Sequence, residues 1–190
     1  MSERSTGVRS DRDGQHGLKS GGDGPSLSGP GTGRMLQPFS LPKGDGTIVR
    51  LADYKQRSNV VLVLHHGGTC PFCRAFLISI GEQVASYAEA ESVVLGISAD
   101  GLETTGELTR ALRLPFDLLS DPSGLVAARE QLATPALVIA DRFGEVWAAW
   151  RAGERHAFPS RAEVGEWLQF VELQCRECEA PEWPPATDEG

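Results

Sequence analysis

His65-His66-Gly67-Gly68-Thr69-Cys70-Pro71-Phe72-Cys73-Arg74 is the stretch around which this chain is organised. The apolar run from Val60 to Leu64 that precedes it is typical of a fully buried strand bounded by turn residues. Beyond the stretch, apolar residues recur at every fourth position and predict one long helix: Phe76, Ile80, Val84 and Ala88. The sequence therefore predicts a strand, a tight turn and a helix that begins beside two cysteines.

The spacing of this motif favours reversible thiol chemistry. Pro71 suits the first helical position, which places Cys70 near the N-cap and Cys73 one turn into the helix. Free N–H groups and the helix dipole stabilise a thiolate at that end, so at least one cysteine should have a lowered pKa. A thiolate beside a second thiol is what disulfide exchange requires. The alternative is that both cysteines are buried apolar side chains without chemistry, which a strand-to-helix junction disfavours.

Hydrophobic periodicity along the rest of the chain predicts an α/β fold. The further strands are expected at 39–41, 47–49, 92–98 and 116–119, followed by a hairpin of 136–140 with 145–150. Three more helices are expected between and after them. Their buried faces are Leu108, Ala111 and Leu112 in the first, Leu125, Ala128 and Leu132 in the second, which follows Asp121-Pro122, and Val164, Trp167, Leu168 and Val171 in the last. This order indicates a mixed central sheet covered by helices. A right-handed crossover then places the cysteines at the carboxyl end of the first core strand.

The strand–C-P-F-C–helix arrangement resembles the thioredoxin superfamily, in particular its peroxiredoxin-like (AhpC/TSA, redoxin) branch. Further segments resemble that branch in the same order: 36–41, 45–54, 94–100 and 119–122, with Thr134-Pro135 before the strand 136–140. The resemblance covers residues 35–173. It implies a thioredoxin-like three-layer fold and a cis peptide bond before Pro135. In such folds the cis-proline leaves the strand end open towards the sulfurs, and Thr134 offers its backbone to a bound partner.

The chain divides into three segments. Residues 1–34 are rich in Gly, Ser, Asp and Arg and are expected to form a disordered tail, residues 35–173 form the thioredoxin-like domain, and residues 174–190 form a C-terminal tail. The last segment carries a second C-x-x-C pair, Cys175 and Cys178. This pair could reduce the first, could join Cys70 and Cys73 in a four-cysteine zinc site, or could be inert.

The sequence leaves the attacking thiol open. By analogy with thioredoxin, Cys70 attacks and Cys73 resolves. The peroxidatic motif of peroxiredoxins is P-x-x-x-T/S-x-x-C, and neither cysteine completes it; no arginine matches the one that peroxiredoxins place near Thr134-Pro135. Disulfide exchange is therefore better supported than peroxide reduction. His66 and Arg74 are candidate supporting residues; the alternatives are a solvated or hydrogen-bonded turn histidine and an exposed helix arginine. Strand alternation lets at most one of His65 and His66 face the sulfurs, and His66 is the nearer.

Composition argues against a nucleic-acid-binding, a membrane-spanning and a secreted protein. The 190 residues are 40% hydrophobic with a net charge of -8, which argues against a broad nucleic-acid surface. No apolar run approaches membrane-spanning length, and no apolar region typical of a secretory signal stands at the N-terminus. Cysteine pairs in that setting favour the reducing cytoplasm.

Two hypotheses follow. The first is a thiol-disulfide or peroxiredoxin-like oxidoreductase, which acts on a small-molecule peroxide or a protein disulfide. It needs no metal and no organic cofactor, only an external thiol reductant such as a thioredoxin. The second is a module of redoxin fold whose cysteines hold zinc or sense oxidation without turnover.

Overall fold

The computed structural model describes residues 34–174. The second cysteine pair, Cys175 and Cys178, and the N-terminal tail up to residue 33 lie outside the described residues. The elements are, in chain order, β1 (Ser40–Pro42), β2 (Ile48–Arg50), the 3-10 helix η1 (Leu51–Tyr54), β3 (Asn59–His65), α1 (Pro71–Gly81), α2 (Val84–Glu89), β4 (Ser92–Ser98), α3 (Leu102–Leu112), β5 (Asp117–Ser120), α4 (Leu125–Arg129), β6 (Ala136–Ala140), β7 (Val146–Arg151) and α5 (Arg161–Glu172).

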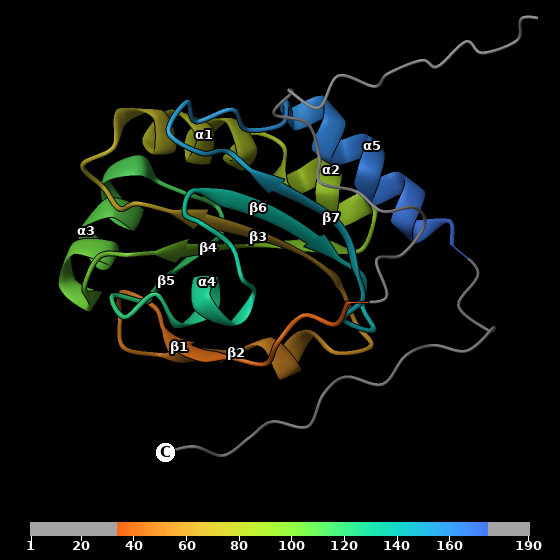
Figure 1. Cartoon of the computed structure of the whole chain (residues 1–190), viewed down its shortest axis with the longest axis horizontal. Helices are drawn as coiled ribbons and strands as arrows, with labels where there is room; N and C mark the ends of the chain where they lie inside the picture. Colours follow the sequence, from red (N-terminus) through yellow and green to blue (C-terminus); the bar gives the residue numbers. More distant parts are fainter. Residues whose placement is uncertain (1–33, 175–190) are drawn as a thin grey trace, which may run out of the picture.

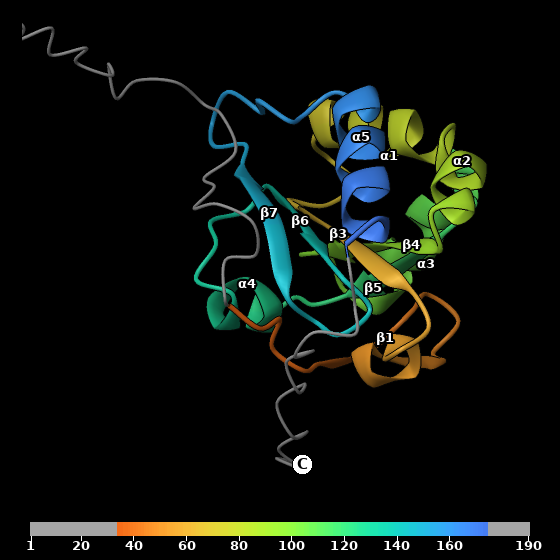
Figure 2. The ribbon, with the colours of Figure 1, turned by 90° about the vertical axis from the view of Figure 1, so that its right-hand side faces the viewer.

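A mixed five-stranded sheet forms the centre, with strand order β5-β4-β3-β6-β7. The pairs β3–β4 and β4–β5 are parallel, whereas β3–β6 and β6–β7 are antiparallel. Helices α1, α2 and α5 cover one face, and the ribbon β1–β2 with α4 covers the other (Figures 1 and 2). The predicted three-layer α/β fold with a mixed sheet between helices is therefore confirmed.

Strand β3 lies at the middle of the sheet and is buried along its whole length. Val61 and Val63 face the layer of α1 and α5, and Val60 and Leu62 face the layer of α4 and β1. Each such side chain contributes about 1.5–3 kcal/mol when it is fully buried. The strand is thus a rigid support for the loop that follows His65. Among residues 34–174, no helix combines the length and the apolar character that crossing a bilayer requires.

The single long helix predicted after Cys70 is wrong: the chain forms two helices, which break after Gly81. A Cβ added at Gly81 would lie 3.1 Å from the Cδ of Pro115, so the helix approaches the segment before β5 closely. The Gln83 N–H then bonds the Ile80 carbonyl at 2.9 Å, three residues back, which tightens the turn and ends the α-helical pattern. Glycine also lowers helix propensity at this position.

The predicted inward face of the helix after Asp121-Pro122 is also wrong in part. Leu125 and Ala128 are exposed, whereas Val126 is buried and Leu132 is buried beyond the end of α4. The cause is the Asp121 carboxylate, which accepts hydrogen bonds from the Leu125 and Val126 N–H groups at 3.0 and 2.9 Å. The helix therefore begins at residue 125 rather than at the proline, with a different face towards the sheet.

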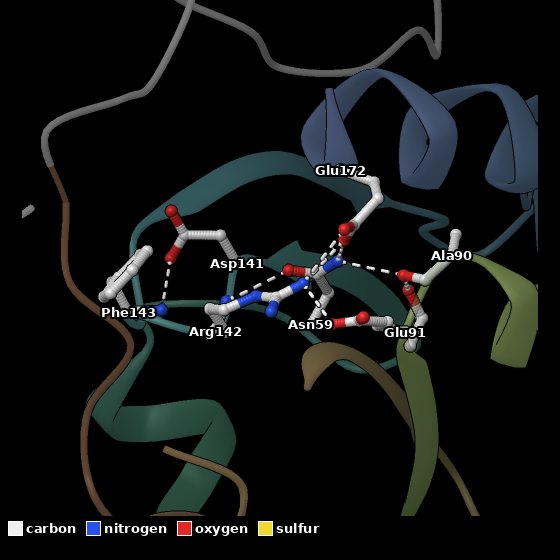
Figure 3. Close-up of polar contacts among 8 residues, drawn as sticks. Asn59, Ala90, Glu91, Asp141, Arg142, Phe143 and Glu172 are labelled. Atoms are coloured by element: carbon white, nitrogen blue, oxygen red, sulfur yellow. Dashed lines mark hydrogen bonds and ion pairs between the residues drawn. The ribbon is translucent and has the colours of Figure 1, made fainter. Parts of the chain in front are cut away.

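A polar cluster fixes the end of β3 that lies farthest from the cysteines (Figure 3). The buried Asn59 side chain donates to the Ala90 carbonyl at 3.0 Å and to Glu172 Oε2 at 2.9 Å, and its oxygen accepts from the Arg142 N–H at 3.1 Å. The Arg142 guanidinium in turn contacts Glu172 and Glu91 at 2.8 and 2.6 Å. One amide therefore joins β3, the turn between β6 and β7, and the end of α5.

Asn59→Ala is expected to lower the free energy of unfolding by about 2–4 kcal/mol, because it removes three hydrogen bonds made by a buried amide. Urea denaturation followed by tryptophan fluorescence measures this. Gln169→Ala, on the exposed side of α5, is the control and should change stability by less than about 0.5 kcal/mol. A similar small loss for Asn59→Ala would show that the cluster does not stabilise the fold.

Candidate active site

The carboxyl end of β3 delivers both cysteines to the start of α1. Cys70 is the N-cap residue, Pro71 occupies the first helical position, and the Cys73 N–H points at the Cys70 sulfur, 3.5 Å away. The predicted placement of the two cysteines is thus confirmed. Because the first N–H groups of a helix have no partner within the helix, they stabilise negative charge on Cys70.

A close contact with Asp100, two residues after the end of β4, fixes the loop before Cys70. The Gly68 N–H donates to Asp100 Oδ2 at 2.6 Å, and a Cβ added at Gly67 would lie 2.4 Å from Asp100 Oδ1. Gly67 also has φ of +116°, a conformation that favours glycine. His65 is buried beneath this loop, and its Nδ1 accepts from the Gly67 N–H at 3.1 Å. Desolvation lowers the pKa of His65 to about 4, so the ring is neutral.

The partly exposed Cys70 is paired with a histidine from a distant loop. Its sulfur lies 3.2 Å from Nε2 of His156, in the segment between β7 and α5. His156 Nδ1 donates to the Glu154 carbonyl at 3.0 Å, which orients the ring. The Phe72 ring stacks on the imidazole with centroids 4.9 Å apart. When charged, this histidine donates an Nε2–H to the thiolate, as in cysteine–histidine pairs that activate a nucleophile.

The second cysteine has a separate histidine. Cys73 is fully buried, and its sulfur lies 4.0 Å from His66 Nδ1. His66 Nε2 donates to the Thr134 carbonyl at 2.9 Å. The Thr134–Pro135 peptide bond is cis, as the resemblance implied. His66, Thr134 and both cysteines therefore lie in one place. His66 rather than the buried His65 faces the sulfurs, as its position nearer to them in the sequence predicted.

The two thiols differ strongly in acidity. Burial raises the pKa of Cys70, but the Cys73 N–H, the His66 side chain, the Cys73 thiol and the charge of His156 together lower it to about 6. Burial raises the pKa of Cys73 to about 12, and the neighbouring Cys70 adds to this effect. Near neutral pH the site therefore holds one thiolate, on the exposed sulfur, beside one thiol.

Of the predicted site residues, Arg74 contacts the loop rather than a sulfur, and two cysteines lie outside the described residues. The Arg74 guanidinium donates to the Gly68 carbonyl at 3.3 Å, so its recorded contact supports the loop rather than a sulfur. Cys175 and Cys178 lie outside the described residues, so their predicted relay or zinc role stays a prediction.

The four side chains of His66, Cys70, Cys73 and His156 converge, each with a potential ligand atom within 4.8 Å of the others.

Sequence reasoning missed His156 and Asp100 as members of the site. His156 lies 86 residues after Cys70 in an irregular segment, and no periodicity or motif marks it. Asp100 had a usable signal, because it follows β4 and the carboxyl ends of parallel strands meet at one edge of a sheet.

Solved structures with this fold include two kinds of thiol protein. The peroxidoxin BcpB of Mycobacterium tuberculosis aligns with a TM-score of 0.65 at 21% identity, over 77% of this chain and 99% of that one. A secreted disulfide oxidoreductase of M. tuberculosis, homologous to DsbE of E. coli, aligns with a TM-score of 0.58 at 23% identity, over 70% and 95%. At these identities the likeness shows the fold alone.

Curated relatives and a family model go beyond the fold and assign the chain to a family. Peroxiredoxin Bcp of Bacillus subtilis is 35% identical over 80 residues, 42% of this chain and 50% of the relative. Chloroplastic peroxiredoxin Q of Oryza sativa subsp. japonica is 31% identical over 112 residues, which are 59% of this chain and 48% of the relative. The chain spans about half the length of the curated relatives it matches. The sequence model of the AhpC/TSA family matches residues 32–151, from the segment before β1 to the end of β7 and with both active-site cysteines inside it; the chain belongs to the AhpC/TSA family.

Proposed function

We propose that this protein is a thiol-dependent oxidoreductase in which Cys70 attacks the substrate and Cys73 resolves the intermediate. The observation that carries the proposal is the asymmetry of the pair. The Cys70 sulfur is partly exposed, caps a helix and lies 3.2 Å from His156, whereas Cys73 is fully buried one turn later. A solvent-accessible thiolate beside a protected thiol is the arrangement that reversible disulfide formation needs.

The first step has two forms. With a peroxide, the Cys70 thiolate attacks the terminal oxygen, the O–O bond breaks, and a proton completes the departing alcohol or water; Cys70 becomes a sulfenic acid. With a disulfide, the thiolate attacks one sulfur, the S–S bond breaks, and the other sulfur leaves as a thiolate. His156, beside Cys70, can hold the proton that the leaving group requires.

The second step closes the intramolecular disulfide. Cys73 attacks the modified Cys70 sulfur and expels water from the sulfenic acid or a thiolate from the mixed disulfide. Because His66 Nε2 already donates to the Thr134 carbonyl, Nδ1 of the neutral ring carries a lone pair towards Cys73 and can accept its proton. This base offsets the high pKa of the buried thiol.

Two electrons from an external dithiol, of the kind that thioredoxins supply, then restore both thiols. A reducing compartment such as the cytoplasm would provide that partner. The peroxiredoxin names of the curated relatives support a peroxide as one substrate, and the cis-proline beside the sulfurs supports a protein disulfide as another.

We expect disulfide reduction to be the faster of the two reactions, because neither cysteine completes the peroxidatic motif. Stopped-flow fluorescence of the reduced protein, mixed with hydrogen peroxide or with a small aromatic disulfide, compares the two second-order rate constants. All of these proteins carry Cys175→Ser/Cys178→Ser, and the control, which also carries Cys70→Ser, should react with neither. A peroxide rate constant above that for the disulfide would identify the protein as primarily a peroxidase.

A further inference from the structure

The four side chains around the sulfurs have the composition and spacing of a soft-metal site. Two sulfurs and two imidazole nitrogens lie within 4.8 Å of one another, with Cys70 Sγ 3.2 Å from His156 Nε2 and Cys73 Sγ 4.0 Å from His66 Nδ1. Tetrahedral zinc with Zn–S bonds of about 2.3 Å and Zn–N bonds of about 2.0–2.1 Å sets ligand–ligand distances of roughly 3.3–3.8 Å. Displacements of a few tenths of an ångström would bring these two pairs to these values, and about 1 Å would bring in the widest pair of the four.

A second observation is independent of the spacing. Each imidazole donates its outer N–H to a backbone carbonyl, His66 to Thr134 at 2.9 Å and His156 to Glu154 at 3.0 Å. In the neutral rings, the nitrogens that face the sulfurs therefore carry lone pairs. Metal-ligating histidines are held in this way, with the second nitrogen bonded to a carbonyl or carboxylate that fixes tautomer and orientation.

We propose that the reduced protein binds one Zn²⁺ through Cys70, Cys73, His66 and His156. Two thiolates and two neutral imidazoles form the closed Cys₂His₂ set that zinc prefers. This set differs from the four-cysteine alternative considered from sequence, because it needs neither Cys175 nor Cys178. The partial exposure of Cys70 and His156 gives the ion a path to the buried Cys73.

Zinc and the disulfide exclude each other at this site. Bound zinc occupies both thiolates and slows their reaction with substrate. A peroxide that oxidises them removes two electrons, forms the Cys70–Cys73 bond and takes up two protons, which yields one alcohol or water from the peroxide, one further water and free Zn²⁺. The metal would thus store the dithiol in a protected form and be released on oxidation.

The test uses the full chain, reduced and freed of metal with a chelator. Titration with Co²⁺ reports coordination through its tetrahedral visible bands and sulfur-to-cobalt charge transfer, and competition with a chromophoric chelator gives the zinc affinity. We expect one equivalent of Co²⁺ to bind, with a charge-transfer intensity typical of two sulfur ligands. His156→Ala and His66→Ala should each weaken zinc binding by more than about tenfold, since loss of even a supporting contact costs 10–100-fold. Circular dichroism confirms that each variant is folded.

The matched control is the double variant Cys175→Ser/Cys178→Ser, which should bind zinc with unchanged affinity. Loss of binding in that variant, or full affinity in both histidine variants, would overturn the proposed ligand set. Stoichiometric release of zinc on addition of peroxide is the expected redox result, and retention of the metal by the oxidised protein would contradict it. Thiol–disulfide cycling, measured with chelator present, tests the oxidoreductase function separately from this site.

Discussion

Cys73→Ser protein is expected to stop at a stable mixed disulfide on Cys70, whereas Cys70→Ser protein should form none. The reason is the position of the two sulfurs: Cys70 is accessible at the helix N-cap, and Cys73 is fully buried. Without Cys73 the first attack still occurs, but nothing within the pair can expel the bound partner. Without Cys70 no accessible thiolate remains, and turnover should fall by more than about a thousandfold, as for other lost nucleophiles.

The measurement is intact-mass spectrometry after incubation with a small disulfide, together with steady-state turnover. Both variants should be made on the Cys175→Ser/Cys178→Ser background, so that the tail cysteines cannot rescue either reaction. A trapped adduct on Cys73 in the Cys70→Ser protein would invert the assignment. Equal trapping in both variants would mean that either thiol can attack and that the burial of Cys73 is not protective.

Features that a local sequence pattern marks could be predicted, and features that such a pattern hides or that depend on distant residues could not. Strand β3 and the cysteine placement were recoverable because a run of buried apolar residues and a proline at the first helical position act locally. The break after Gly81 was not, because the apolar pattern at every fourth position continues through the glycine and hides the local turn at Gln83. Likewise the inward face of α4 depends on where the Asp121 carboxylate caps the chain.

The candidate site divides in the same way. Cys70, Cys73 and His66 lie in one short stretch, and the resemblance to a known family added Thr134 and Pro135. His156 reaches Cys70 only because the loop after β7 folds back over the start of α1. The sequence shows only that residue 156 is a histidine, and a histidine outside any motif more often has no catalytic role. The charged group that helps lower the pKa of Cys70 from a distant loop is therefore the one that sequence could not identify.

The lowered pKa of Cys70 should set the pH dependence of the protein. With a Cys70 pKa of about 6, against an ordinary value of 9.0, alkylation of the reduced Cys175→Ser/Cys178→Ser protein by iodoacetamide should rise with pH through about 6 and level off above about 7. At pH 7 roughly nine-tenths of Cys70 is then thiolate, whereas an unshifted thiol would be about one-hundredth ionised. Cys73, with a pKa of about 12, contributes no second rise in this range.

His156→Ala removes the positive charge that faces Cys70 and should move the inflection upward by about one pH unit, the lower end of the shift that a close opposite charge produces. At pH 6 the thiolate fraction would fall from about one half to about one tenth, so alkylation would slow about fivefold, while the rates above pH 8 converge. His156→Lys keeps a positive charge and should recover part of the shift. Chelator in the buffer keeps metal from masking the thiols. An unchanged inflection in His156→Ala would mean that the helix N-terminus and His66 lower the pKa of Cys70 without His156, and His156 would then lose its place in the mechanism.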